Sequence, residues 1–212
     1  MQIFRNRMTH LLSILSAAAC AVVLCQANVY ALEVGEKAPD FSLLDTQGHK
    51  HTLSEAKGKY VVLEWFNPDC PFVKKHYGSG NMQELQNVYT KQQGVVWFSI
   101  DSSAPGKQGN YPAEELEKIM QEKGSSATAI LLDANGKVGR TYGAKTTPHM
   151  FVINPEGILI YAGAIDDKPS VEPADVAGAH NYVQYALHEA MGGKPLTSPK
   201  TDSYGCSVKY AD

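Results

Sequence analysis

The sequence has little cysteine and little excess charge. It contains four cysteines in 212 residues and carries a formal net charge of −3. Its basic residues form no run longer than Lys74-Lys75, which argues against a nucleic-acid-binding surface. The apolar stretch at residues 11–24 is too short to favour a transmembrane helix. We therefore expect no nucleic-acid partner and no stable membrane span.

The N-terminal residues have the pattern of a secretory signal peptide. Arg5 and Arg7 form a basic region, the apolar stretch at residues 11–24 follows it, and residues 29–31 (Val-Tyr-Ala) offer a small-residue cleavage site. We expect residues 1–31 to be removed and the mature protein to be periplasmic or secreted.

Removal of this segment leaves few thiols. It deletes two arginines and no acid, so the net charge changes from −3 to −5. It also deletes Cys20 and Cys25, which leaves Cys70 and Cys206 in the mature chain. Cys20 follows three alanines, but the leucine usual three residues before a lipidated cysteine is missing, so lipidation is the less favoured outcome.

Cys70 lies where a strand is expected to pass into a helix. Residues 61–66 (VVLEWF) are mostly branched or aromatic and predict a buried strand. Pro71 suits the first turn of a helix, because its missing N–H would be unpaired there. Cys70 then meets free amide protons and the positive end of the helix dipole, which favour the nucleophilic thiolate. Such a thiol in an exported protein indicates redox chemistry.

The remaining pattern predicts one α/β domain at residues 32–194 and a tail at residues 195–212 that carries Cys206. We expect a crossover that joins parallel strands in the first half and an antiparallel pair of strands near the end. The expected elements are a hairpin at 41–53, strands at 95–100, 129–132, 150–153 and 158–162, helices at 71–77, 82–92, 112–120 and 176–191, and a short helical or extended piece at 138–142.

Four motifs resemble those of a known superfamily. They are G-E-K-A-P-D-F at 35–41, W-F-N-P-D-C-P-F-V-K-K-H-Y at 65–77, T-T-P-H-M-F-V-I at 146–153 and G-C-S-V-K-Y at 205–210. Together they resemble thioredoxin-like redoxins, in the secreted peroxiredoxin-like branch grouped with alkyl hydroperoxide reductase/thiol-specific antioxidant proteins. The resemblance covers nearly all of residues 35–210. It implies a thioredoxin-like α/β fold, with a central mixed sheet flanked by helices and the hairpin as an N-terminal extension.

The resemblance also implies roles for individual residues. Pro148 matches the cis-proline of the fold and Thr147 packs beside the active thiol, so both are expected to bind substrate together with Pro71. Glu64 matches the buried acid of thioredoxin. A carboxylate in an apolar strand is costly to bury unless it is paired or neutral, and a raised pKa would suit proton transfer to a thiol. The alternative for Glu64 is a glutamate that faces solvent.

Two family motifs are missing. The C-x-x-C pair of thioredoxin is absent, because Val73 stands three residues after Cys70. The peroxiredoxin motif P-x-x-x-(S/T)-x-x-C is absent too, because its proline and hydroxyl positions are Leu63 and Asn67. Asn67 remains a candidate catalytic residue that donates a hydrogen bond to a peroxide or a thiolate. The missing motif favours disulfide exchange over fast peroxide reduction.

Cys206 is the internal candidate for resolving an oxidised Cys70. A second possibility is a permanent Cys70–Cys206 disulfide, which would contribute roughly 5 kcal/mol by the chain-entropy model. In a third, Cys206 pairs with another molecule.

We thus expect an exported, antioxidant-type thiol oxidoreductase. Its substrates would be thiol or disulfide proteins or small hydroperoxides, an external thiol would reduce it, and no cofactor or metal is implied. The alternative is a non-catalytic binding module that holds Cu(I) or Zn²⁺ through Cys70 with His76 or His149, although the spacing is not that of a metal motif.

Overall fold

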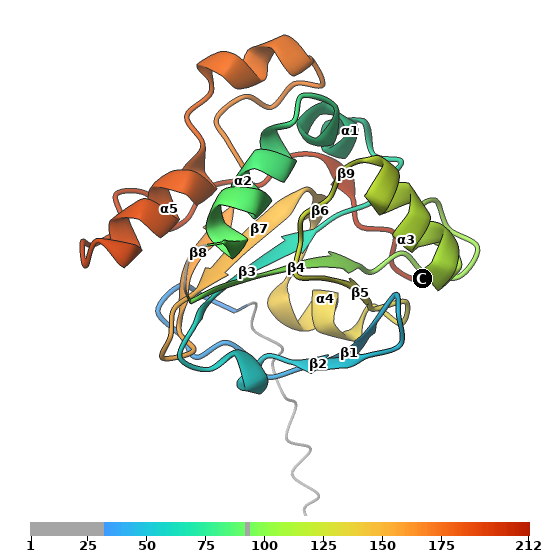
Figure 1. The fold of residues 1–212 in the computed structure, drawn as a ribbon, viewed down its shortest axis with the longest axis horizontal. Coiled ribbons are helices and arrows are strands. Elements are labelled where there is room, and N and C mark those ends of the chain that lie inside the picture. Colours follow the sequence, from blue (N-terminus) through green and yellow to red (C-terminus); the bar gives the residue numbers. More distant parts are fainter. Residues whose placement is uncertain (1–31, 92–93) are drawn as a thin grey trace, which may run out of the picture.

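The computed structural model describes residues 32–91 and 94–212, so the expected signal peptide lies outside the described residues. A seven-stranded mixed sheet forms the centre of the molecule, with helices on both of its faces (Figure 1). The strands are β1 (Ser42–Asp45), β2 (Lys50–Thr52), β3 (Tyr60–Trp65), β4 (Val95–Asp101), β5 (Ala129–Leu132), β7 (His149–Ile153) and β8 (Leu159–Gly163). The helices are α1 (Pro71–Gly78), α2 (Asn81–Thr90), α3 (Ala113–Glu122), α4 (Lys137–Tyr142) and α5 (Tyr182–Met191), with 3-10 turns η1 (Ser54–Ala56) and η2 (Pro173–Gly178).

The strand order is β2-β1-β5-β4-β3-β7-β8. β3, β4 and β5 run parallel, and β7 and β8 form the expected antiparallel pair. The connection from β3 through α1 and α2 to β4 is the predicted crossover. The predicted N-terminal hairpin is confirmed as β1 and β2, and β1 also pairs with β5, so the hairpin extends one edge of the sheet. This arrangement confirms the predicted mixed α/β fold.

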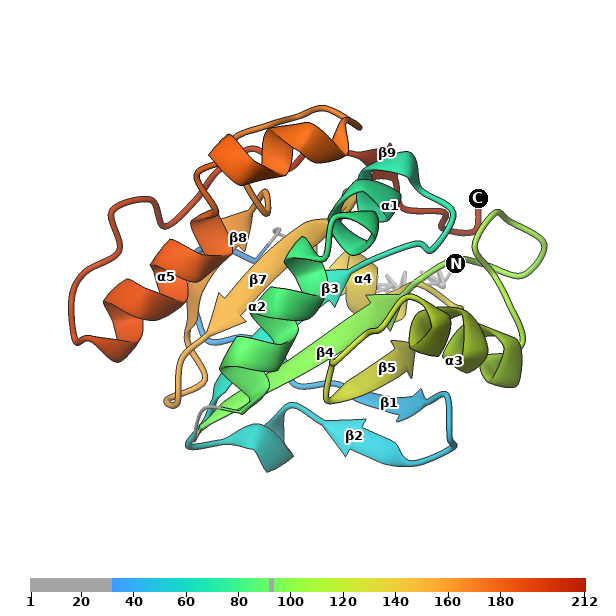
Figure 2. The same cartoon turned by 45° about the horizontal axis from the view of Figure 1, so that its top comes forward.

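Successive side chains of β3 point to opposite faces of the sheet and belong to two separate hydrophobic cores. Val61, Leu63 and Trp65 pack towards α4, whereas Val62 and the following Phe66 pack towards α1, α2, α3 and α5. Figure 2 shows the latter helices gathered on one face of the sheet and α4 behind it. Because successive side chains of a strand point to opposite faces, Glu64 shares the face of Val62 and points towards α1 and α2.

The last predicted helix is wrong in its first part. Residues 176–191 were expected to be one helix, but the chain forms η2, breaks, and starts α5 only at Tyr182. Gly178 is a poor helix former, and Asn181 is a favoured N-cap residue. The Asn181 side chain accepts a hydrogen bond from the Gln184 amide at 2.9 Å, so it caps α5 and defines where this helix begins.

The C-terminal tail packs back on the domain. Thr201 N donates to Ala162 O at 3.1 Å and Val208 N donates to Lys145 O at 3.0 Å. Between these contacts, the short strand β9 (Cys206–Ser207) pairs antiparallel with β6 (Thr146–Thr147). Both views place β9 beside α1 (Figures 1 and 2).

Among the helices that the described residues form, none has the length and apolar character needed to cross a membrane.

Candidate active site

The turn after β3 places Cys70 at the start of α1. Asn67 shapes this turn, because its Oδ1 accepts from the Asp69 amide at 2.9 Å and its carbonyl accepts from the Cys70 amide at 3.1 Å. Cys70 is the N-cap residue with extended backbone angles (φ −65°, ψ 126°), and Pro71 follows in the first turn. The predicted position of Cys70 at a helix N-terminus is therefore confirmed.

The structure brings the two cysteines of the described chain together. Cys70 Sγ lies 2.8 Å from Cys206 Sγ although 136 residues separate them in sequence, and both are free thiols. The pairing of Cys206 with Thr147 in the β6–β9 sheet holds the tail at this place. Cys70 is 0% exposed and Cys206 is half-buried, so Cys206 is the outer of the two sulfurs.

The two thiols have opposite ionisation tendencies. Burial raises the pKa of Cys70, but several hydrogen bonds, the largest of them from the Cys206 thiol, together outweigh it, and the net pKa lies below its usual value. Burial, together with the contact and charge of Cys70, raises the pKa of Cys206 to about 11. Cys70 is thus the thiol that ionises first, as expected for a nucleophile at a helix N-terminus.

Thr147 and Pro148 lie directly at the thiol pair. The Thr147–Pro148 peptide bond is cis, as the resemblance predicted. The Thr147 carbonyl oxygen lies 3.0 Å from Cys70 Sγ and can accept its proton while Cys70 is a thiol. Gly205 lets the tail approach closely, since a Cβ at this position (φ +137°) would lie 2.1 Å from the same carbonyl oxygen. A substrate role for Thr147, Pro148 and Pro71 stays a prediction.

Glu64 is buried rather than solvent-facing, at 0% exposure. Four side chains donate to its carboxyl group: Tyr77, Gln86, Trp97 and Ser99, at 2.8 to 3.2 Å. Burial raises the pKa of Glu64 although these donors oppose the shift. Tyr77 belongs to α1, so the carboxyl group is linked through it to the helix that carries Cys70. Proton transfer by Glu64 stays a prediction.

Asn67 has both ends of its side-chain amide occupied. Besides the bond from Asp69, its Nδ2 donates to Gln108 O at 2.9 Å. A Cβ on Gly109 would lie only 2.4 Å from the Asn67 side chain, which leaves this amide little freedom to move. Asn67 therefore holds two loops together, and its predicted contact with a peroxide or thiolate would require these bonds to open.

The two histidines considered as partners of Cys70 make other contacts. His76 contacts Tyr204 Oη at 3.2 Å and Asn81 Nδ2 at 2.9 Å, and His149 Nδ1 accepts from the Lys145 amide at 3.2 Å. Within residues 32–91 and 94–212, no three His, Cys, Asp or Glu side chains form a group that could hold a metal ion.

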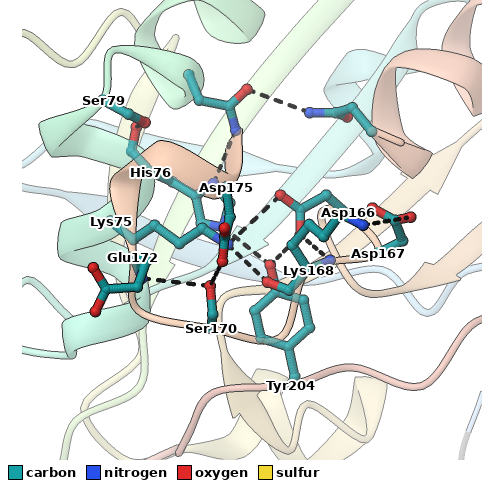
Figure 3. Close-up of polar contacts among 12 residues, drawn as sticks. Lys75, His76, Ser79, Asp166, Asp167, Lys168, Ser170, Glu172, Asp175 and Tyr204 are labelled. Carbon is teal, nitrogen blue, oxygen red and sulfur yellow. Dashed lines mark hydrogen bonds and ion pairs between the residues drawn. The ribbon is translucent and has the colours of Figure 1, made fainter. Parts of the chain in front are cut away.

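A buried polar cluster beside the thiols was not predicted from the sequence. Lys75, His76, Asp166 and Tyr204 converge there from α1, the loop after β8 and the tail (Figure 3). In the sequence, Lys75 stands out only as part of the longest basic run, whereas the structure leaves it 1% exposed. The available signal was its place in α1 between Val73 and Tyr77, both of which pack in the core.

Solved structures with the same arrangement of elements identify the fold class. A hypothetical protein from Sinorhizobium meliloti superposes with a TM-score of 0.70 and 25% identity, over 86% of this chain and 97% of its own. The thioredoxin domain of a thiol-disulfide oxidoreductase from Bacteroides vulgatus superposes with a TM-score of 0.51 and 20% identity, over 70% and 98%. These similarities define the fold class of this chain as thioredoxin-like.

Sequence comparison gives the family. The AhpC/TSA family profile matches residues 34–162, and the chain belongs to this family. It is 31% identical over 127 residues to the thiol-disulfide oxidoreductase ResA of Geobacillus kaustophilus, covering 60% of this chain and 67% of that protein. It is 24% identical over 147 residues to the thioredoxin-like protein YneN of Bacillus subtilis, covering 68% and 81%. The predicted family is confirmed.

Proposed function

We propose that this protein catalyses thiol–disulfide exchange, with Cys70 as the nucleophile and Cys206 as the resolving thiol. The observation that carries the proposal is the 2.8 Å separation of the two sulfurs at the N-terminus of α1. The relatives named thiol-disulfide oxidoreductases support the same chemistry.

The reaction has two exchanges. The Cys70 thiolate attacks one sulfur of a substrate disulfide, forms a mixed disulfide and expels the other substrate sulfur as a thiolate. The Cys206 thiolate then attacks Cys70 Sγ, forms the Cys70–Cys206 disulfide and expels the second substrate thiolate. An external thiol reductant supplies the two electrons that restore both cysteines.

Formation of the mixed disulfide on Cys70 favours ionisation of Cys206, which carries out the second exchange. Burial, then the hydrogen bond and charge of Cys70, raise the pKa of Cys206. Once Cys70 is in a mixed disulfide it carries no charge, so the last contribution disappears and Cys206 ionises more readily. Because Cys70 is fully buried in the reduced protein, the substrate must displace the β9 segment to reach it.

Disulfides fit this site better than hydroperoxides do. The peroxiredoxin motif would place a proline and a hydroxyl residue where the chain has Leu63 and Asn67. The Asn67 amide is already bonded to Gln108 and Asp69. We assign Thr147, Pro148 and Pro71 to the substrate cleft and Glu64 to proton transfer, on the basis of their places around Cys70 and its helix.

We further propose that the protein acts outside the cytoplasm, because residues 1–31 have the composition of a signal peptide. The mass of the protein recovered from the periplasm or medium of an expressing bacterium tests this. Loss of about 31 residues is the expected result, and retention of the complete N-terminus in the cytoplasm contradicts it.

The exchange activity is tested with the mature protein, glutathione disulfide, a peptide disulfide and hydrogen peroxide. We expect the wild type to form the Cys70–Cys206 disulfide, Cys206→Ser to accumulate a mixed disulfide on Cys70, and Cys70→Ser to lose turnover. Hydrogen peroxide should be consumed much more slowly than the disulfides. Equal turnover by Cys70→Ser and the wild type would rule out the proposal.

A further inference from the structure

We infer that Tyr204 is a positioning residue for the Cys70–Cys206 exchange: anchored in a buried polar cluster on α1, it holds Cys206 over Cys70. The inference rests on the proposed function. It concerns residues outside the thiol pair, whereas the hydrogen bonds of Cys70 Sγ are to Thr147 O and to Cys206 Sγ.

Tyr204 forms part of a directed chain of hydrogen bonds. Asn81 Nδ2 lies 2.9 Å from His76 Nδ1, and His76 Nε2 lies 3.2 Å from Tyr204 Oη. The Tyr204 hydroxyl donates to Asp166 Oδ1. Figure 3 shows His76 and Tyr204 meeting near Asp166.

The protonation states agree with this direction. Burial lowers the pKa of His76 to about 4, so the imidazole is neutral and has one N–H at neutral pH. With Asn81 donating to Nδ1, this proton is on Nε2 and is donated to Tyr204 Oη. Burial and the neighbouring Asp166 raise the pKa of Tyr204, so its hydroxyl keeps its proton and donates. The side chains of Asn81, His76 and Tyr204 therefore each donate to the next member of the chain, whereas Asp166 Oδ2 has no hydrogen-bond partner among the described residues.

Asp166, the last acceptor in this series of hydrogen bonds, is held in place by a buried ion pair with Lys75. Asp166 is 1% exposed and Lys75 Nζ lies 3.9 Å from its Oδ2. Lys75 Nζ also donates to Lys168 O at 2.7 Å, and the Lys168 amide donates to Asp166 Oδ1 at 3.0 Å. A buried carboxylate that loses a donor is costly, so the Tyr204 hydroxyl is held strongly in this place.

Tyr204 and its aromatic partner Phe72 lie close in sequence to Cys206 and Cys70, respectively. Tyr204 precedes Cys206 by two residues, and Phe72 follows Cys70 by two. The rings of Phe72 and Tyr204 contact each other edge to face, with centroids 5.7 Å apart. The intervening Gly205 lies against the Thr147 carbonyl. The contact between Tyr204 and Phe72 therefore joins the tail to α1 two residues from each reacting cysteine.

Tyr210 offers a matched comparison on the other side of Cys206. Its hydroxyl also donates a single hydrogen bond from the tail, to Ala144 O at 2.9 Å, and its ring lies 4.5 Å from the Arg140 guanidinium. It contacts α4 rather than α1. If any loosening of the tail had the same effect, Tyr204→Phe and Tyr210→Phe would behave alike.

The test uses Tyr204→Phe, which keeps the ring and removes the hydroxyl. The full mature chain is equilibrated with reduced and oxidised glutathione, and the effective concentration of Cys206 towards Cys70 is measured. We expect a fall of about tenfold, because a hydrogen bond to a charged group is lost. In the reduced protein, alkylation of Cys70 by iodoacetamide should accelerate by about the same factor, since the cover over Cys70 opens more often.

Two results would overturn the inference: wild-type values for Tyr204→Phe in both measurements, or equal changes in Tyr204→Phe and Tyr210→Phe. If Tyr204→Phe does not fold, Asp166→Asn, which removes the charge that holds the hydroxyl, is tested in the same way. Failure of the proposed function looks different, since the wild type itself would then form no Cys70–Cys206 disulfide with glutathione.

Discussion

At the scale of single residues, the neighbours of each cysteine decide which one ionises. The helix N-terminus favours the Cys70 thiolate, but burial opposes it, and the Cys206 thiol is one of the donors that outweigh burial. Cys206 therefore acts on Cys70 in two ways. It stabilises the Cys70 thiolate, and it covers the sulfur.

Replacing Cys206 separates these two effects. In Cys206→Ala the donor is lost, so the midpoint of Cys70 alkylation against pH should move upward. The plateau rate above the midpoint should rise, because the sulfur is uncovered. Both quantities come from iodoacetamide kinetics followed by mass spectrometry. Ser207→Ala, an exposed change in the same strand, is the control. A midpoint that stays at the wild-type pH would contradict the assigned role of the Cys206 donor.

Glu64 should make stability depend on pH in a defined direction. Burial raises its pKa above the usual 4.5, so the folded state holds its proton at pH values where the unfolded state has lost it. The contribution of Glu64 to stability is then fully present below pH 4.5 and is lost as the pH rises through the folded-state pKa. Glu64→Gln removes this titration, and the stability of the variant relative to wild type should increase over that range.

The measurement is urea unfolding of both proteins between acidic and neutral pH. A glutamine can keep the local bonds, with its oxygen accepting from Trp97 and its amide donating to the Tyr77 hydroxyl. Glu84→Gln removes the same charge from an exposed position of α2 and serves as the control. A stability difference between wild type and Glu64→Gln that does not vary with pH would show that Glu64 titrates normally.

At the scale of elements, the start of α5 depends on one cap. Asn181→Ala should lower the free energy of unfolding by about 1 kcal/mol, because the Gln184 amide loses its partner. Asn181→Asp retains an acceptor at this position and should lose much less. Chemical denaturation of the three proteins gives the answer, and equal losses in both variants would point to the other contacts of Asn181 instead.

The elements most accurately predicted from the sequence were those with strong local signals. β5 was predicted with its observed bounds, and α1 was predicted from the strand-breaking residues 67–69 and Pro71. The helix expected at 176–191 was wrong only in its first part, because its apolar residues follow a helical period while Gly178 and Asn181 interrupt it before α5 begins at Tyr182. In this segment, the helix-breaking glycine and the N-cap residue determined the helix boundary more strongly than the apolar period did.

At the scale of the whole molecule, the sequence was sufficient to propose Cys206 as a partner of Cys70, but not to predict the buried polar cluster beside the two thiols. Cys206 could be proposed as a partner because the chain expected after signal-peptide removal has no other second thiol. The cluster around Asp166 could not be found in this way, since Lys75, Asp166 and Tyr204 lie far apart in sequence and each resembles an ordinary surface residue. Only the folded chain shows that they share a buried site.

The disulfide between the two thiols should stabilise the whole chain. Joining residues 136 apart restricts the unfolded state, and the chain-entropy model gives a gain of up to about 5 kcal/mol. Each 1.4 kcal/mol of this gain corresponds to a factor of ten by which folding raises the effective concentration of Cys206 at Cys70. Unfolding of the oxidised and reduced wild type in urea measures the gain, with Cys206→Ser under both conditions as the control. An oxidised wild type no more stable than the reduced one would mean that the fold does not favour the Cys70–Cys206 bond.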